Sequence, residues 1–176
     1  MRFLVYRFKR PVFRKPSKHG QLLRSLVYRK VESVFAAKGR AVRISGIDHV
    51  ALTHWRQSWL PGFQVTPTAS AHWDWARLYR QRVAEPYRLD MAIWADLGPA
   101  GYQLCGLAIG GPSRGRTLIN VGFVAGSPIA NPLRGSILPI AAEVAETYGA
   151  CWSSTEVRFV HPLQGAYPAY LALAGC

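Results

Sequence analysis

The spacing of apolar residues predicts alternating strands and helices along most of the chain. Strands are indicated where apolar and β-branched residues run together or alternate, and helices where apolar residues recur at steps of three and four. The predicted strands are residues 40–52, 89–94, 102–109, 118–124 and 156–160. The predicted helices are residues 21–37, 54–60, 71–84, 137–148 and 167–174, the last being a short helix or a turn. This order predicts a mixed α/β fold whose largely antiparallel sheet is flanked by helices.

The stretch from Leu118 to Tyr148 combines a buried strand, a loop with Gly, Pro and Asn, and an amphipathic helix that Gly149 is expected to end. The first N–H groups of such a helix lack partners within the helix, and the positive end of its dipole points outward. A phosphate can therefore bind there. Many strand–loop–helix connections bind nothing, so a purely structural interpretation stays open.

Two further segments allow both a functional and a structural interpretation. The helices at 54–60 and 71–84 carry Trp55, Trp59 and Trp75, which we expect to form core and cleft wall rather than platforms for stacked bases. The Gly- and Arg-rich segment 110–116 has the composition of a phosphate loop. Because it joins two predicted strands and begins no helix, we expect a hairpin turn.

Charge divides the chain into two parts. The formal net charge is +13, and residues 1–43 hold 13 of the 22 Lys and Arg residues with one acid, Glu32, whereas the remainder is close to neutral. We therefore expect a basic N-terminal extension over 1–40, irregular or weakly paired before its amphipathic helix, followed by one domain over 41–176. The extension either binds an anionic macromolecule, such as nucleic acid, or is a solvated segment, and its helix binds a partner or packs on the core.

Cysteine content and the first residues bear on location. Cys105, Cys151 and Cys176 are odd in number and lack metal-site spacing, so we expect reduced thiols, with Cys105 buried. Arg2 and Arg7 interrupt the first apolar run, which is untypical of a signal peptide, and no apolar run reaches membrane-spanning length. A transit peptide would show more Ser. These features favour a cytoplasmic protein without a transmembrane segment.

The order of elements and the residues of 118–176 resemble the GCN5-related N-acetyltransferase superfamily. In that family, the strand before the central helix splays from its neighbour and binds the pantetheine arm of acetyl-CoA. The pyrophosphate binds an Arg/Gln-x-x-Gly-x-Gly/Ala loop at the start of the helix. Here Asn131 to Leu138 is the matching segment, with bulky Ile137 and Leu138 where the family has small residues. The resemblance implies that acetyl-CoA contacts Val121, Gly122, Phe123, Val124, Arg134, Gly135, Ser136 and Ile137.

The terminal segment resembles the family's Tyr-x-x-Leu-Gly-Phe signature, whose tyrosine often protonates the departing CoA thiolate. Tyr170 is the best match and Tyr167 the second, although Ala174 replaces the glycine. Either tyrosine can instead be an aromatic at the edge of the core.

Two departures from the family pattern concern the base and the sheet edge. Ala125-Gly126 stands where many relatives have a glutamate that deprotonates the amine, which leaves Asp90, Glu156 and His161 as candidates by location. The chain ends at Cys176, where relatives usually add strands. The sheet is therefore shorter, or the N-terminal extension or a partner chain covers its edge.

The leading hypothesis is an N-acyltransferase that moves an acetyl group from acetyl-CoA to an amine held between the helices at 54–84 and the strand at 89–94. The basic extension would bring an anionic macromolecule, such as tRNA, ribosome or DNA, to the site. The alternative is an inactive scaffold of the same fold that binds nucleic acid or a protein through its extension. A third hypothesis is binding of residues 1–37 to an anionic membrane surface.

Overall fold

A computed structural model describes residues 4–7, 20–65, 70, 73–85, 87–160, 162 and 167–174. Its sheet has the strand order β1-β6-β5-β4-β3-β2. The strands are β1 (Leu4–Arg7), β2 (Val42–Ser45), β3 (Leu89–Asp96), β4 (Tyr102–Pro112), β5 (Leu118–Gly126) and β6 (Glu156–Phe159). Neighbouring strands are antiparallel except β5 and β6, which are parallel. The predicted mixed α/β class with a largely antiparallel, open sheet is confirmed.

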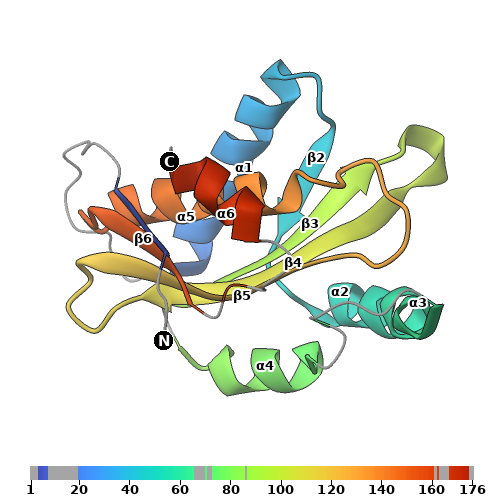
Figure 1. The fold of residues 1–176 in the computed structure, drawn as a ribbon, viewed down its shortest axis with the longest axis horizontal. Helices are drawn as coiled ribbons and strands as arrows, with labels where there is room; N and C mark the ends of the chain where they lie inside the picture. The colour runs from blue at the N-terminus through green and yellow to red at the C-terminus, as the bar shows by residue number, and fades with distance from the viewer. Residues whose placement is uncertain are drawn as a thin grey trace.

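Helices cover both faces of the sheet (Figure 1). On one face lie α1 (Gly20–Ala37), α5 (Ile137–Ala150) and α6 (Tyr167–Ala174). On the other lie α2 (His49–His54), the π-helical turn η1 (Trp55–Trp59), α3 (Leu60–Val65) and α4 (Trp75–Arg82), and a short 3₁₀ turn, η2 (Gly98–Ala100), joins β3 to β4. The two layers bury separate apolar clusters against the sheet.

The helix α5 forms the centre of the larger cluster. Its residues Ile140, Val144 and Tyr148 recur at steps of four, and all three are fully buried. The helix α1 contributes Val31 and Phe35 to the same cluster. The apolar stripe of α1 therefore packs on the core of the protein. This was one of the two alternatives for this helix, the other being that it binds a partner.

The smaller cluster contains the tryptophans of the second layer. Trp59 and Trp75 have no exposed surface, and the indole N–H of Trp59 donates to the carbonyl of Leu104 at 3.2 Å. Trp55 is also buried, on the wider turn of η1 that joins α2 and α3 into one continuous helix. These helices therefore form core, as predicted, and β4 and β5 form the expected hairpin around residues 113–117.

The structure corrects two expectations. The predicted strand 40–52 ends at Ser45, because the carboxylate of Asp48 accepts from the N–H of Ala51 and begins α2. Gly149 does not end α5, which continues to Ala150.

The first residues of the chain were expected to be irregular or weakly paired, and β1 does pair with β6, from Leu4 opposite Phe159 onward. The extension thus covers the edge of β6, which is one of the arrangements expected for this edge.

Cysteine burial and helix length complete this comparison. Cys105 is buried, as predicted, and Cys151 is half-buried; both are free thiols whose pKa values burial raises. Cys176 lies outside the described residues. Within the described ranges, no helix has both the length and the apolar character needed to cross a membrane.

Candidate active site

The strands β5 and β6 pair along only part of their length. Their register runs from Leu118 opposite Glu156 to Val121 opposite Phe159, and the N–H of Val160 adds a bond to the carbonyl of Val121 at 2.9 Å. Beyond Val121, β5 continues to Gly126 alongside β4. On its β6 side, this second half of β5 has no strand partner within the described residues. Among the described residues, no strand therefore occupies the backbone groups on this side of β5.

A β-bulge lies where β5 leaves β6. Ile109 faces Phe123, whereas the next residue, Gly110, faces Val121, so Gly122 is an extra residue in β5. A bulge bends its strand and increases the local twist. Gly110 allows the close approach that this bend requires, since a Cβ there would lie 2.3 Å from the carbonyl oxygen of Asn120. The bulge at Gly122 thus directly follows Val121, the last residue of β5 in register with β6.

The side chains of the predicted pantetheine-binding segment pack into the two apolar clusters on either face of the sheet. Val121 and Val124 are buried in the α5-side cluster. Phe123 points to the opposite face, where its ring meets that of Trp73 at 5.1 Å in an edge arrangement. Gly122 is half-buried between them. What this segment offers a ligand is therefore its backbone groups.

The loop before α5 retains only part of the predicted set of amides. Arg134 and Gly135 are exposed, and Gly135 has a positive φ of 80° that suits glycine. The N–H groups of Arg134 and Ser136 donate to the carbonyls of Asn131 and Leu133, at 3.3 and 2.9 Å. These two amides are therefore occupied.

The amides of Gly135, Ile137 and Leu138 make no hydrogen bond within the described residues. Pro139, the third residue of α5, has no N–H to add. Three backbone donors therefore remain at this helix start for an anion.

A cavity of about 400 Å³ opens beside this helix start. Gly135 and Ser136 line it together with Lys38 and Arg40, which follow α1, and with two acids of α5, Glu143 and Glu146. Ser136 is only 3 % exposed, yet its side chain makes no capping hydrogen bond. Lys38 and Arg40 were not among the residues predicted from the sequence, because they lie almost 100 positions before α5. Their only local sign of a role is their position on either side of Gly39, the glycine that follows α1.

Tyr170 lies at the point where β5 and β6 separate. Its ring packs on Phe159, the last β6 residue paired with β5, with centroids 5.2 Å apart. Tyr170 is 4 % exposed, and burial raises the pKa of its hydroxyl to about 12. Leu173, one turn further along α6, lines the cavity at the start of α5. Tyr167, the second candidate, is half-buried at the beginning of α6.

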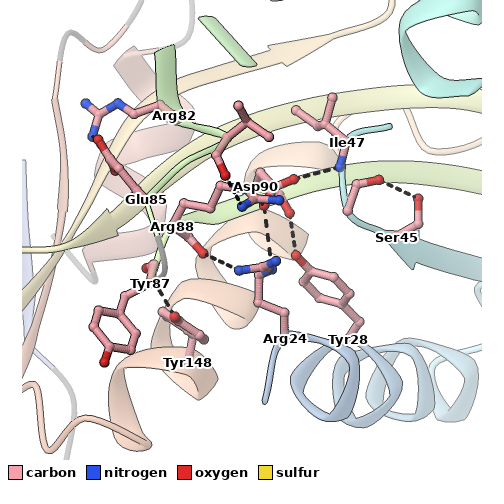
Figure 2. Close-up of polar contacts among 12 residues, drawn as sticks. Arg24, Tyr28, Ser45, Ile47, Arg82, Glu85, Tyr87, Arg88, Asp90 and Tyr148 are labelled. Atoms are coloured by element: carbon pink, nitrogen blue, oxygen red, sulfur yellow. Dashed lines mark hydrogen bonds and ion pairs between the residues drawn. The ribbon is translucent and has the colours of Figure 1, made fainter. Parts of the chain in front are cut away.

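Neither of the two described candidate bases lies at this separation. The carboxylate of Asp90 accepts from Arg88 Nε at 2.9 Å and from the N–H of Ile47 at 2.9 Å, so both its oxygens are engaged (Figure 2). Glu156 begins β6, three positions before the last pair with β5. His161 lies outside the described residues.

The chain matches no protein-family model and no curated protein sequence. A function for this protein therefore has to be inferred from the arrangement of β5, β6, α5 and α6.

Proposed function

We propose that this protein is an acyl-CoA-dependent N-acyltransferase, a divergent member of the GCN5-related superfamily, that transfers an acetyl group from acetyl-CoA to an amine. The observation that carries the proposal is the departure of β5 from β6 at the Gly122 bulge, with Tyr170 beside it and the start of α5 nearby. A parallel strand pair that opens next to a helix N-terminus offers a slot for an extended chain that ends in phosphates.

The pantetheine arm takes the place of a strand in this slot. Its amide groups bond to the backbone of β5 between Gly122 and Gly126, as an added strand would. A backbone N–H of the same segment then polarises the thioester carbonyl, and such a positioned donor stabilises the charge that develops on the oxygen. This role depends on the backbone, which agrees with the burial of the Val121 and Val124 side chains.

The pyrophosphate lies at the start of α5. The amides of Gly135, Ile137 and Leu138 serve as its backbone donors in this proposal, and the helix dipole adds favourable charge. Lys38 and Arg40, which line the cavity at this helix start, add positive charge where bulky Ile137 and Leu138 replace the small residues of the family's loop.

The reaction is a direct transfer. The amine nitrogen attacks the thioester carbonyl carbon, a C–N bond forms, the C–S bond breaks, and the thiolate takes the hydroxyl proton of Tyr170. The amine loses its proton to water, and solvent returns a proton to the tyrosinate. Holding the two reactants in contact supplies much of the acceleration. The basic extension brings an anionic macromolecule to this site in the cytoplasm.

The Tyr170→Phe variant is expected to lower kcat by about 100-fold, because it removes the proton donor for the departing thiolate. The measurement is steady-state release of free CoA thiol, with Tyr167→Phe as the matched control, since it removes a hydroxyl from the same helix. We expect the control to retain wild-type kcat.

The pH dependence of the reaction gives a second expectation for Tyr170. Its hydroxyl acts in the protonated form and its pKa is about 12, so ionisation of Tyr170 should not lower kcat between pH 7 and pH 10. Equal activity of Tyr170→Phe and wild type would exclude the proposed role.

Acetyl-CoA is expected to raise the midpoint of thermal unfolding by about 5 °C or more at a concentration of 100 times Kd, because it binds only the native state. The shift should largely disappear in a Lys38→Glu, Arg40→Glu double variant. An Arg77→Glu, Arg114→Glu variant has the same change of charge at exposed positions outside the site, and it should keep the shift.

Absence of any shift in the wild type would overturn the proposed function and leave the non-catalytic scaffold. A shift of equal size in both double variants would retain acetyl-CoA binding but move the pyrophosphate away from Lys38 and Arg40.

A further inference from the structure

A second, polar pocket lies at the other edge of the sheet, where β2 ends. It has a volume of about 610 Å³ and lies between α1, the chain that follows β2, and α4. Its charged residues are Arg24, Arg29, Glu32, Arg43, Asp48, Arg88 and Asp90. No residue of the proposed acyl-CoA site lines this pocket.

The three carboxylates of the pocket are already engaged by backbone groups. Glu32 accepts from the N–H of Ile44 at 2.6 Å, Asp48 from that of Ala51 at 2.9 Å, and Asp90 from that of Ile47 at 2.9 Å. Each of these acids therefore holds a turn or a strand end in place. A bound cation would have to compete with these bonds.

The arginines, in contrast, have donors to spare. Arg24 and Arg88 share the single carboxylate of Asp90, with Nε atoms 3.6 and 2.9 Å from the same oxygen (Figure 2). At this part of the wall, two guanidinium groups therefore face one carboxylate. Since Arg24 is 6 % exposed, its charge is poorly solvated and favours a nearby anion.

The position of Arg24 is fixed from several sides. Its Nη1 donates to the carbonyl of Arg88 at 3.1 Å, and Tyr28, one turn along α1, donates its hydroxyl to the carbonyl of Asp90. The Nη2 group of Arg24 has no partner in the described part of the chain. Arg29, exposed at the mouth of the pocket, likewise makes no contact with a described acid or carbonyl group.

We infer that this pocket binds a small molecule through an oxyanion, either a carboxylate or a phosphate group. Arg24 contacts the anion in the pocket, and Arg29 attracts it at the mouth. Guanidinium groups suit both anions because their parallel N–H groups match two oxygens. The cavity volume is within the range of small-molecule sites. The inference does not depend on acyl transfer, and its test contains no acyl-CoA.

The test is isothermal titration of the full chain with inorganic phosphate and, separately, with succinate, in chloride buffer at constant ionic strength. We expect saturable binding of one anion per chain. Arg29→Glu should weaken it at least tenfold, and Arg24→Gln should abolish it. Arg56→Glu is the matched control, because Arg56 is exposed on the second helical layer and carries the same change of charge. This control should bind as the wild type does.

The relative strength of the two probes identifies the group, a phosphate or a carboxylate. Equal weakening by Arg29→Glu and Arg56→Glu would overturn the inference, because the net charge of the protein would then explain the binding. Absence of saturable heat with both probes would also overturn it. If Arg24→Gln does not fold, Arg29→Glu and its control decide the question alone, since both replace exposed side chains.

Discussion

Gly110→Ala is expected to lower the free energy of unfolding by about 3 kcal/mol, the upper end of what an added methyl group usually costs in a packed interior. A Cβ at this position would lie 2.3 Å from the oxygen of Asn120 and 2.9 Å from the Cα of Val121. Both are backbone atoms of β5, so no side-chain rotation can relieve the contact. The two strands must separate at the bulge, and their cross-strand bonds must weaken.

The adjacent glycine offers the control. A Cβ at Gly111 would come no closer than 3.5 Å to its nearest neighbour, the carbonyl oxygen of Tyr87, which is ordinary contact. We expect Gly111→Ala to change stability by less than about 1 kcal/mol. The measurement is urea unfolding of both variants with intrinsic tryptophan fluorescence as the signal. Equal stability of the two variants would show that β4 and β5 do not approach as closely as the register at Gly110 requires.

Asp90→Asn is expected to destabilise the protein by about 3 to 5 kcal/mol, because it leaves two guanidinium groups beside a neutral amide. The side chains of Arg24 and Asp90 are 8 % and 2 % exposed, so water cannot replace the lost carboxylate. The amide also presents a donor to one of its neighbours, each of which is itself a donor. The loss should therefore exceed that of a single hydrogen bond.

The ion pair between Arg82 and Glu85 serves as the control for Asp90→Asn. Its atoms are 3.1 Å apart, but the two side chains are 46 % and 47 % exposed, so solvent screens the attraction. Glu85→Gln should change stability by less than about 1 kcal/mol in the same urea titration. A loss below about 1 kcal/mol for Asp90→Asn as well would show that the buried cluster contributes little to folding.

Much of the fold follows from local patterns in the sequence. The apolar residues of α5 recur every four positions, and those of β5 form a continuous run. Each pattern shows which residues are buried without reference to the element that they pack against. The end of β2 was harder to predict, because the apolar alternation continues to Ile47. Asp48 begins a helix at that point, and the competition between a cap and a strand is decided by tertiary packing.

The candidate site was only partly predictable for a different reason. Tyr170 and the start of α5 belong to short segments with recognisable patterns, so the sequence alone names them as candidates. Lys38 and Arg40 reach the start of α5 only through the packing of α1 on α5. The bulge at Gly122 depends on the register between β4 and β5. Neither feature leaves a periodic signal in the sequence.

The pairing of β1 with β6 has a consequence for the basic segment that follows it. Residues 8–19 hold five Lys and Arg residues and no acid, and the chain is held at Arg7 by β1 and at Gly20 by α1. Because both of these ends belong to the folded part of the chain, the residues between them have a contour length of at most roughly 45 Å. An anionic polymer that binds these five cations must therefore come within that distance of both β1 and α1.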